Sequence, residues 1–251
     1  MTDAKGNSMT ITDFHSHVLP MMDDGSQSPE ESLKMLKLLR SQGVDRVVAT
    51  PHFYPKQEDP ESFLKRRDIA ETMLKSAISF AGLSERDIPE VCIGAEVAYY
   101  NGMSLSKDVK KLCIKGTDVM LLEMPFYKWS DTVVNEVCKM QDELGIQIVL
   151  AHIDRYLQYA DSAKLFKLKT YRVLMQANAD PFLRFLSGRK MIKLLLTNQI
   201  SLMGSDFHNL DTRCSNMDAA VELILERGYF SKLKNIMNTA DELLSDADKL
   251  V

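Results

Sequence analysis

All five histidines of the chain fall at the carboxyl ends of apolar, β-branched runs. Two carboxylates end similar runs, Glu96 in "IGAEV" and Glu123 in "LLEMP". Imidazole and carboxylate groups together suit Mn²⁺, Fe²⁺ or Zn²⁺, and the absence of cysteine from the set argues against a structural zinc site. These residue types predict a metal centre that performs chemistry. The candidate ligands are His15, His17, Asp24, His52, Glu96, Glu123, His152, Asp206 and His208.

The spacing of these residues predicts more than one ion. Alternate side chains of a strand point to the same face, so His15 and His17 can bind one metal, and the same holds for Asp206 and His208. A six-coordinate metal that keeps one position open for water takes about five protein ligands. Nine candidates therefore fit two or three ions that share bridging carboxylates.

The same residues also have simpler interpretations. A single histidine at a strand end is usually a hydrogen-bonded structural residue. A carboxylate in an apolar run is more telling, because its burial is costly unless it is paired or bound to a metal. The segment "MMDDGS" is also ordinary turn chemistry. We favour Asp24 as a ligand and Asp23 as a turn residue or a group that orients a ligand, and the sequence leaves open whether Asp23 joins Asp24 in the site.

The elements that must position these residues alternate along the chain. Near-continuous apolar runs predict strands covered on both faces, as in a parallel sheet, at 9–17, 44–53, 91–100, 118–126, 146–152, 172–180 and 200–208. Helical patterns lie between them at 28–42, 61–80, 129–144, 181–197 and 217–227, followed by two short pieces after Ser231. In the first, Ser28 can cap, Pro29 fits the first turn and Gly43 ends the helix.

This alternation predicts an α/β fold, either a β/α barrel or a doubly wound sheet, and we favour a single-domain barrel of seven strands. In such a barrel the carboxyl ends of the strands converge on one face, so ligands scattered from residue 15 to residue 208 would meet in one site. The expected domain spans 9–251, with a polar extension at 1–8.

Composition excludes several other classes. The chain has 251 residues, 45% hydrophobic and 26% charged, with a net charge of −4 and no basic run that would follow a phosphate backbone, so nucleic acid is a poor partner. The four cysteines form no CxxC and are interpreted as reduced thiols. The absence of an 18-residue apolar run or a signal-peptide pattern favours a cytoplasmic protein without membrane insertion.

The motifs "DFHSHVLPMMDDGS", "ATPHF", "GAEV", "LLEMP", "LAHIDRY" and "GSDFHNLDTR" resemble the polymerase and histidinol phosphatase (PHP) superfamily. More narrowly, the chain is similar to bacterial manganese-dependent protein-tyrosine phosphatases that act with tyrosine kinases of capsule and exopolysaccharide synthesis. The resemblance covers nearly the whole chain, from about Ile11 onward, with all six motifs in order.

This resemblance implies a distorted (β/α)₇ TIM-like barrel with three divalent metal ions, Mn²⁺ favoured and Fe²⁺ or Zn²⁺ as alternatives. Arg155 and Arg213 would contact the phosphate. The implied ligand sets are His15, His17, Glu96 and Asp206 for the first ion, Glu96, Glu123 and His152 for the second, and Asp24, His52 and His208 for the third.

The implied reaction is hydrolysis of a phosphate monoester by a hydroxide that bridges two metals, with phosphotyrosine of a bacterial tyrosine kinase as the expected substrate. No cysteine nucleophile is required. Aromatic residues after the ligand-bearing strands are candidates to line a pocket for the aryl ring, although core packing explains them equally well: Phe53, Tyr54, Phe126, Tyr127 and Trp129.

Two other functions stay open at the level of sequence, and a third is disfavoured. A small-molecule phosphatase of the histidinol phosphatase type would use the same metals and arginines. A non-catalytic, metal-stabilised module that binds phosphorylated partners would also contain the ligand set. A polymerase-associated exonuclease would need a nucleic-acid groove, which an acidic single domain does not offer. The oligomeric state is not predicted.

Overall fold

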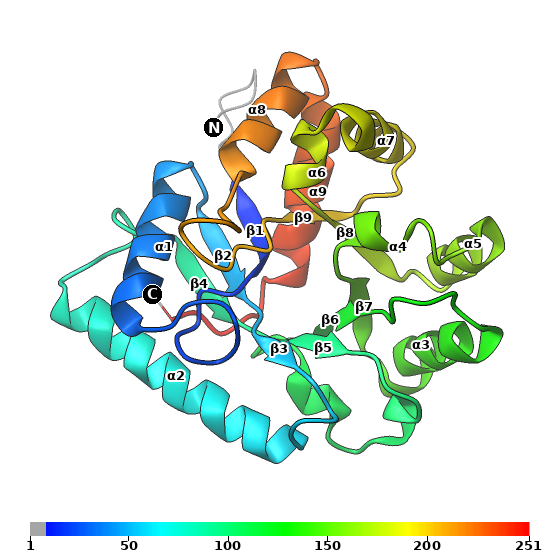
Figure 1. Ribbon diagram of the computed structural model, residues 1–251, viewed down its shortest axis with the longest axis horizontal. Helices are drawn as coiled ribbons and strands as arrows, with labels where there is room; N and C mark the ends of the chain where they lie inside the picture. The colour runs from blue at the N-terminus through cyan, green and yellow to red at the C-terminus, as the bar shows by residue number, and fades with distance from the viewer. Residues whose placement is uncertain (1–8, 251) are drawn as a thin grey trace.

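The strands pair in parallel throughout the computed structural model, which describes residues 9–250, and helices surround them (Figure 1). The predicted extension at 1–8 lies outside the described residues. The strands are β1 (Thr12–Ser16), β2 (Arg46–Ala49), β3 (His52–Phe53), β4 (Glu90–Ile93), β5 (Glu96–Ala98), β6 (Val119–Glu123), β7 (Gln147–Leu150), β8 (Leu174–Asn178) and β9 (Leu202–Gly204).

Two predicted strands are each interrupted once. Pro51 has no N–H to donate, and the strand breaks there into β2 and β3. The next strand breaks beside it at Gly94, into β4 and β5. Hydrogen bonds from Gly94 N to Ala49 O (2.8 Å) and from Glu96 N to Pro51 O (3.0 Å) keep the two interrupted strands side by side. In the described chain the strands therefore occupy the seven positions that the sequence predicts.

The first and last strands close the sheet into a barrel. His17 N donates to Phe207 O at 2.8 Å, and Asp206 N donates to His15 O at 2.8 Å. A Cβ on Gly204 would lie 2.6 Å from the Cβ of His15, so the approach of β9 to β1 requires glycine. These contacts confirm the distorted (β/α)₇ TIM-like barrel and rule out the open, doubly wound alternative.

The helices largely follow the predictions. Ser28 caps α1 by accepting from Glu31 N, with Pro29 in the first turn. The helix buries Met35, Leu36 and Leu39, whereas Leu33 is only partly buried. The bounds are α1 (Pro29–Ser41), α2 (Pro60–Phe80), α3 (Asp131–Leu144), α4 (Ile153–Tyr156), α5 (Ser162–Thr170), α6 (Asp180–Leu183), α7 (Phe185–Leu196), α8 (Met217–Glu226) and α9 (Phe230–Leu243), with 3₁₀ turns at Met103–Leu105 and Val109–Leu112.

Three helical features differ from the predictions. The helix predicted at 181–197 is divided by Arg184, whose extended backbone (φ −85°, ψ 141°) separates α6 from α7. The segment after β7 forms α4 and α5, which the sequence did not indicate. The prediction of two short C-terminal pieces is wrong, because α9 is one helix of 14 residues that buries Leu233, Ile236 and Met237 at helical spacing.

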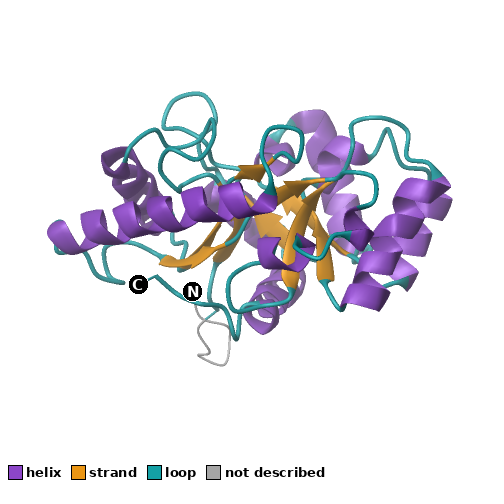
Figure 2. Ribbon diagram, turned by 90° about the horizontal axis from the view of Figure 1, so that it is seen from below, coloured by secondary structure: helices purple, strands orange, loops and turns teal. Residues whose placement is uncertain are grey.

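The loops after the strands gather along one edge of the molecule, and helices flank the strands on both sides (Figure 2). All four cysteines are free, and Cys214 alone among them is not buried. None of the helices in residues 9–250 has the length and apolar character needed to cross a bilayer.

A buried aspartate holds the closure of the barrel together. Asp13 accepts hydrogen bonds from Ser205 N (2.7 Å) and His15 N (3.2 Å), and it is fully shielded from solvent. We expect Asp13→Ala to lower the free energy of unfolding by about 3 kcal/mol, because three buried donors, His15 N, Ser205 N and Ser205 Oγ, lose an ionisable acceptor. Urea unfolding in a chelating buffer measures this, with exposed Glu226→Ala as control. Equal, small changes in both variants would contradict it.

Candidate metal centre

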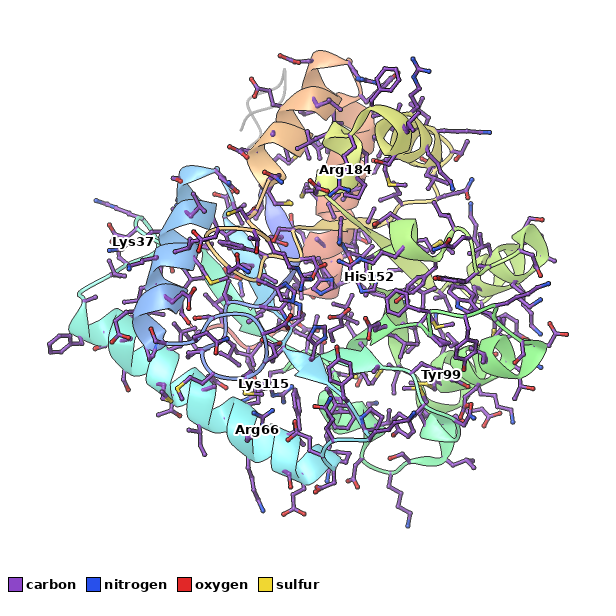
Figure 3. The ribbon with its side chains drawn as sticks, viewed as in Figure 1. Lys37, Arg66, Tyr99, Lys115, His152 and Arg184 are labelled. Atoms are coloured by element: carbon purple, nitrogen blue, oxygen red, sulfur yellow. The ribbon has the colours of Figure 1, made fainter. Side chains whose placement is uncertain are left out.

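The ends of the strands bring the candidate ligands together at the mouth of the barrel. The parallel register pairs His52 of β3 with Glu96 of β5, and Ala98 of β5 with Glu123 of β6. His152 follows β7, and Asp206 and His208 follow β9. Figure 3 shows His152 near the middle of the view, where the strands converge. The structure thus gathers all nine predicted ligands into one site.

Glu96 lies at the centre of this site, with 1% of its surface exposed. One carboxylate oxygen, Oε2, lies 3.2 Å from His15 Nε2 and 2.9 Å from His52 Nδ1. The other oxygen, Oε1, lies 2.7 Å from His152 Nε2. Because its two oxygens face different histidines, Glu96 has the geometry of a bridging carboxylate.

Asp206 completes a group around the two histidines of β1. Its Oδ1 lies 3.6 Å from His15 Nε2 and 3.4 Å from His17 Nε2, and the two imidazole nitrogens are 3.2 Å apart. With Glu96 Oε2 3.5 Å from His17 Nε2, these four side chains converge on one point.

Two further groups flank the first. His152 Nε2 lies 3.6 Å from Glu123 Oε1, next to Glu96. On the other side, Asp24 Oδ1 lies 3.4 Å from His208 Nε2 and 3.6 Å from His52 Nε2. Among the described residues, the ligand atoms closest to one another form groups that overlap the three implied ligand sets without reproducing them, so the division of ligands among ions stays a prediction. His52 lies between two of the implied sets because its Nδ1 faces Glu96 while its Nε2 faces Asp24.

Unpartnered polar atoms test whether these residues fit a metal. Buried polar atoms almost always have a hydrogen-bond partner. Here four buried atoms of the candidate ligands have none: His52 Nδ1, Glu96 Oε2, His152 Nδ1 and His208 Nε2. Three of these atoms, all except His152 Nδ1, face neighbouring ligand groups at 2.9–3.4 Å. Oxygen and imidazole nitrogen atoms that converge in this way are the arrangement expected of a divalent metal site.

The electrostatics of the centre favour cations. Burial opposes the charged form of His17, yet the Asp23 carboxylate raises its pKa to about 10. Burial likewise opposes charge on His152, but hydrogen bonds to Glu123 and Glu96 raise its pKa to about 9. The pKa of Glu96 falls well below its usual value despite burial, because of His15. In the absence of metal, protons on the imidazoles supply the positive charge that the carboxylates need.

Asp23 contacts the candidate ligand His17, as one of the two roles predicted for it requires. Its Oδ2 accepts from His17 Nδ1 at 2.7 Å and from His52 N at 2.8 Å. Gly25 closes the turn, where a Cβ would lie 2.3 Å from His17 O. With Nδ1 protonated, the Nε2 of His17 is directed to the centre. The carboxylate of Asp23 also lies near Asp24 and His52, so its proximity alone leaves a direct role open.

The contribution of β8 was not predicted from the sequence. Gln176 is fully buried, and its Oε1 accepts from His152 N (2.7 Å) and lies 3.2 Å from His15 Nδ1. Its Nε2 donates to Asn178 Oδ1 (3.0 Å), and Asn178 Nδ2 donates to Asp206 Oδ2 (3.2 Å). Two amides thereby connect three ligands. The available signal was the pair of polar residues at alternate positions in "LMQAN".

Two candidate ligands have strained backbones. His152 and Asp206 adopt positive φ angles of 29° and 56° although neither is glycine. Such conformations cost about 1–3 kcal/mol and persist where surrounding contacts enforce them, often at functional sites.

The two predicted phosphate-binding arginines lie over the centre. Arg155 forms a hydrogen bond with Asp206 Oδ2, and Arg213 Nη2 lies 3.1 Å from both oxygens of the same carboxylate. Both side chains are 38% exposed. They are therefore not remote surface ion pairs: each guanidinium is held at the site and is reachable from solvent.

Metal binding at this centre should release protons. Since the pKa values of His17 and His152 are raised to about 10 and 9, both imidazoles are protonated at pH 7 in the metal-free chain. Binding must displace about two protons, and affinity should increase as pH rises toward 9. Calorimetry of Mn²⁺ binding in two buffers of different ionisation enthalpy measures this. A heat that is independent of buffer would contradict it, and His152→Gln should release one proton fewer.

Gln176 should matter for metal affinity. We expect Gln176→Leu to weaken Mn²⁺ binding about 10- to 100-fold, because His15 loses the acceptor that fixes its ring orientation. Gln176→Glu keeps that acceptor and should retain more of the affinity than leucine. Calorimetric titration of metal-free protein compares the two, and equal affinities would show that the contact with His15 is unimportant.

Comparisons with known proteins agree with this geometry. Residues 11–244 match the family described as capsular polysaccharide synthesis, CpsB/CapC. The chain is 26% identical to tyrosine-protein phosphatase YwqE of Bacillus subtilis (strain 168), over 93% of this chain and 91% of the relative. It is also 26% identical to tyrosine-protein phosphatase CpsB of Streptococcus pneumoniae, over 90% and 94%.

A solved structure shows the same fold. It comes from work on YwqE from Bacillus subtilis and CpsB from Streptococcus pneumoniae, described as unique metal-dependent tyrosine phosphatases. It superposes with a TM-score of 0.77 at 22% identity and covers 95% of this chain and 96% of its own. The family match, which spans most of the chain, decides the assignment: this protein belongs to the CpsB/CapC family of capsular polysaccharide synthesis.

Proposed function

We propose that this protein is a metal-dependent protein-tyrosine phosphatase that hydrolyses phosphotyrosine in a bacterial tyrosine kinase of capsule or exopolysaccharide synthesis. The observation that supports this most is the convergence of nine metal-type ligands beneath two arginines in a CpsB/CapC chain. The names of the relatives, tyrosine-protein phosphatases, supply the substrate class.

The proposed cofactor is three divalent ions, with Mn²⁺ favoured and Fe²⁺ or Zn²⁺ as alternatives. His15, His17, Glu96 and Asp206 would hold one ion, Glu96, Glu123 and His152 the second, and Asp24, His52 and His208 the third. Bound ions would lower the pKa of the attacking water and neutralise the phosphoryl oxygens.

The arginines would position the phosphoryl group. Arg155 and Arg213 both contact Asp206, and a phosphate at the centre would compete with that carboxylate for their guanidinium groups. A planar guanidinium offers two parallel hydrogen bonds to phosphate oxygens, which lysine cannot match. Since both side chains are part-exposed, they can reach a phosphate that enters from solvent.

The cysteines do not supply a nucleophile. Burial raises the pKa of the Cys92 thiol to about 11 and that of Cys113 to about 12, so neither forms a thiolate at neutral pH. Cys214 is partly exposed beside Arg213, but no phosphate-cradling CxxxxxR loop follows it. The chemistry therefore falls to the metal centre.

The decisive experiment measures hydrolysis of a phosphotyrosine peptide before and after metal removal. Chelation should abolish activity, and Mn²⁺ should restore it. Asp206→Ala should lower kcat/KM by at least about 10³-fold, because it removes a ligand and the anchor of both arginines. Cys214→Ser is the matched control in the same loop and should retain activity. Chelator-resistant turnover, or loss of activity in the serine variant, would refute the proposed mechanism.

Substrate choice separates this proposal from its alternatives. Faster hydrolysis of histidinol phosphate than of phosphotyrosine peptides would favour the small-molecule phosphatase. Metal-loaded protein that binds phosphotyrosine peptides without turnover would favour the non-catalytic module.

A further inference from the structure

Two cavities of opposite character lie on either side of the metal centre. One, of about 500 Å³, is lined by charged groups of both signs: Arg155, Arg184, Arg213, Asp154, Asp180, Asp206 and Asp211. The other, the tyrosine-lined pocket, has a volume of about 360 Å³ and is lined mainly by Tyr54, Pro55, Tyr99, Tyr100, Pro125 and Tyr127. Figure 3 shows Arg184 and Tyr99 on opposite sides of His152.

The tyrosine-lined pocket lies beside the cavity that contains two candidate metal ligands, with the Tyr54 ring between the pocket and His52. Tyr54 and Gln57 line it and also line the cavity that contains Asp24 and His52. The Tyr54 ring stacks on the His52 ring, with centroids 4.9 Å apart and planes inclined by 24°. A group bound in this pocket is therefore separated from a metal ligand by a single aromatic ring.

One wall of the pocket is fixed in place. The Tyr99 hydroxyl donates to Glu136 Oε2 at 2.8 Å, and Glu136 is 8% exposed. The other oxygen of Glu136 accepts from Ser104 N and Ser104 Oγ, both at 3.2 Å. Tyr127, by contrast, is 55% exposed at the rim. The pocket combines a rigid aromatic wall with an open edge, which suits a flat ring that enters from solvent.

We propose, on the basis of the proposed function, that the tyrosine-lined pocket receives the aryl ring of the phosphotyrosine substrate. In an aryl phosphate one oxygen joins phosphorus to the ring, so the ring can only occupy a pocket that adjoins the metal centre. No Asp or Glu lines this pocket, and aromatic rings stabilise one another in stacked or edge-on arrangements.

The charged cavity is the complementary half of the site. Arg155 and Arg213 suit phosphoryl oxygens, whereas Arg184 is paired with Asp180. A neutral ring placed in this cavity would desolvate several ionised groups without compensation. In this proposal the phosphoryl oxygens face the cavity with the arginines, and the aryl ring lies in the tyrosine-lined pocket. Of the aromatic residues proposed from the sequence to line a pocket for the aryl ring, Tyr54 and Tyr127 do line this pocket. Phe53 and Trp129 are buried in the core, and Phe126 packs on His152 outside the pocket.

The test is the ratio of kcat/KM for phenyl phosphate to kcat/KM for glycerol 1-phosphate, measured on Mn²⁺-loaded protein. We expect Tyr127→Ala and Tyr99→Leu each to lower this ratio about 3- to 10-fold, the loss expected for one aromatic contact. Tyr99→Phe keeps the ring and should lower it less than leucine. Phe80→Ala, which removes a 97% exposed aromatic side chain from the end of α2, is the matched control and should leave the ratio unchanged.

Phenyl phosphate has no neighbouring peptide residue, so a fall in its ratio identifies the ring itself as the occupant. If the variants lower kcat/KM for phosphotyrosine peptides but leave the ratio for phenyl phosphate unchanged, the pocket binds a neighbouring side chain of the peptide and the proposal is wrong. Equal loss for both esters, or no change in folded variants, also overturns it. Calorimetric affinities for phenylphosphonate and methylphosphonate give the same comparison without turnover. Protein that hydrolyses neither ester but still prefers phenylphosphonate, with the preference lost in Tyr127→Ala, would retain the pocket and reject the proposed function.

Discussion

Glu96 is a carboxylate almost completely removed from water, and four histidines from three segments of the chain surround it. An ionised carboxylate is stable in such a place only with positive charge close by. The strands that carry these histidines end beside Glu96 and so place positive charge next to it. The interruptions at Pro51 and Gly94 contribute to this, because they leave His52 and Glu96 in direct register on neighbouring short strands.

Around this carboxylate the orienting groups are of two kinds. Asp23 holds His17 with a charged hydrogen bond, whereas Gln176 holds His15 with a neutral one. A carboxylate raises the basicity of the histidine it contacts, and an amide does so less. The imidazoles of His15 and His17 therefore differ in basicity although both belong to one HxH motif. The amides of β8 also add no charge to a centre that already contains several carboxylates.

The sequence predicted the strands because their apolar runs are long and end in ligand-type residues. It also predicted the site, because ionisable residues such as His15, Glu96 and Asp206 are uncommon at the ends of apolar strands. Gln176 and Asn178 could not be found this way, because an amide in a strand has many ordinary explanations. The helix α5 was not predicted because it buries only Leu168, so its own periodicity gives little signal. The aromatic candidates separated into core and pocket residues only when the loops were placed.

Closure of the barrel joins the earliest and the latest strands of the chain. His15 N and Ser205 N both donate to the carboxylate of Asp13, and Asp206 N donates to His15 O, although these segments are about 190 residues apart. During synthesis from the ribosome, the first histidines emerge long before their partners on β9 exist. The nascent chain thus carries an incomplete ligand set for most of its translation. In the proposed metal centre the full ligand set would exist only once the whole domain has formed, so coordination geometry rather than the affinity of an exposed HxH segment would decide which ion is retained.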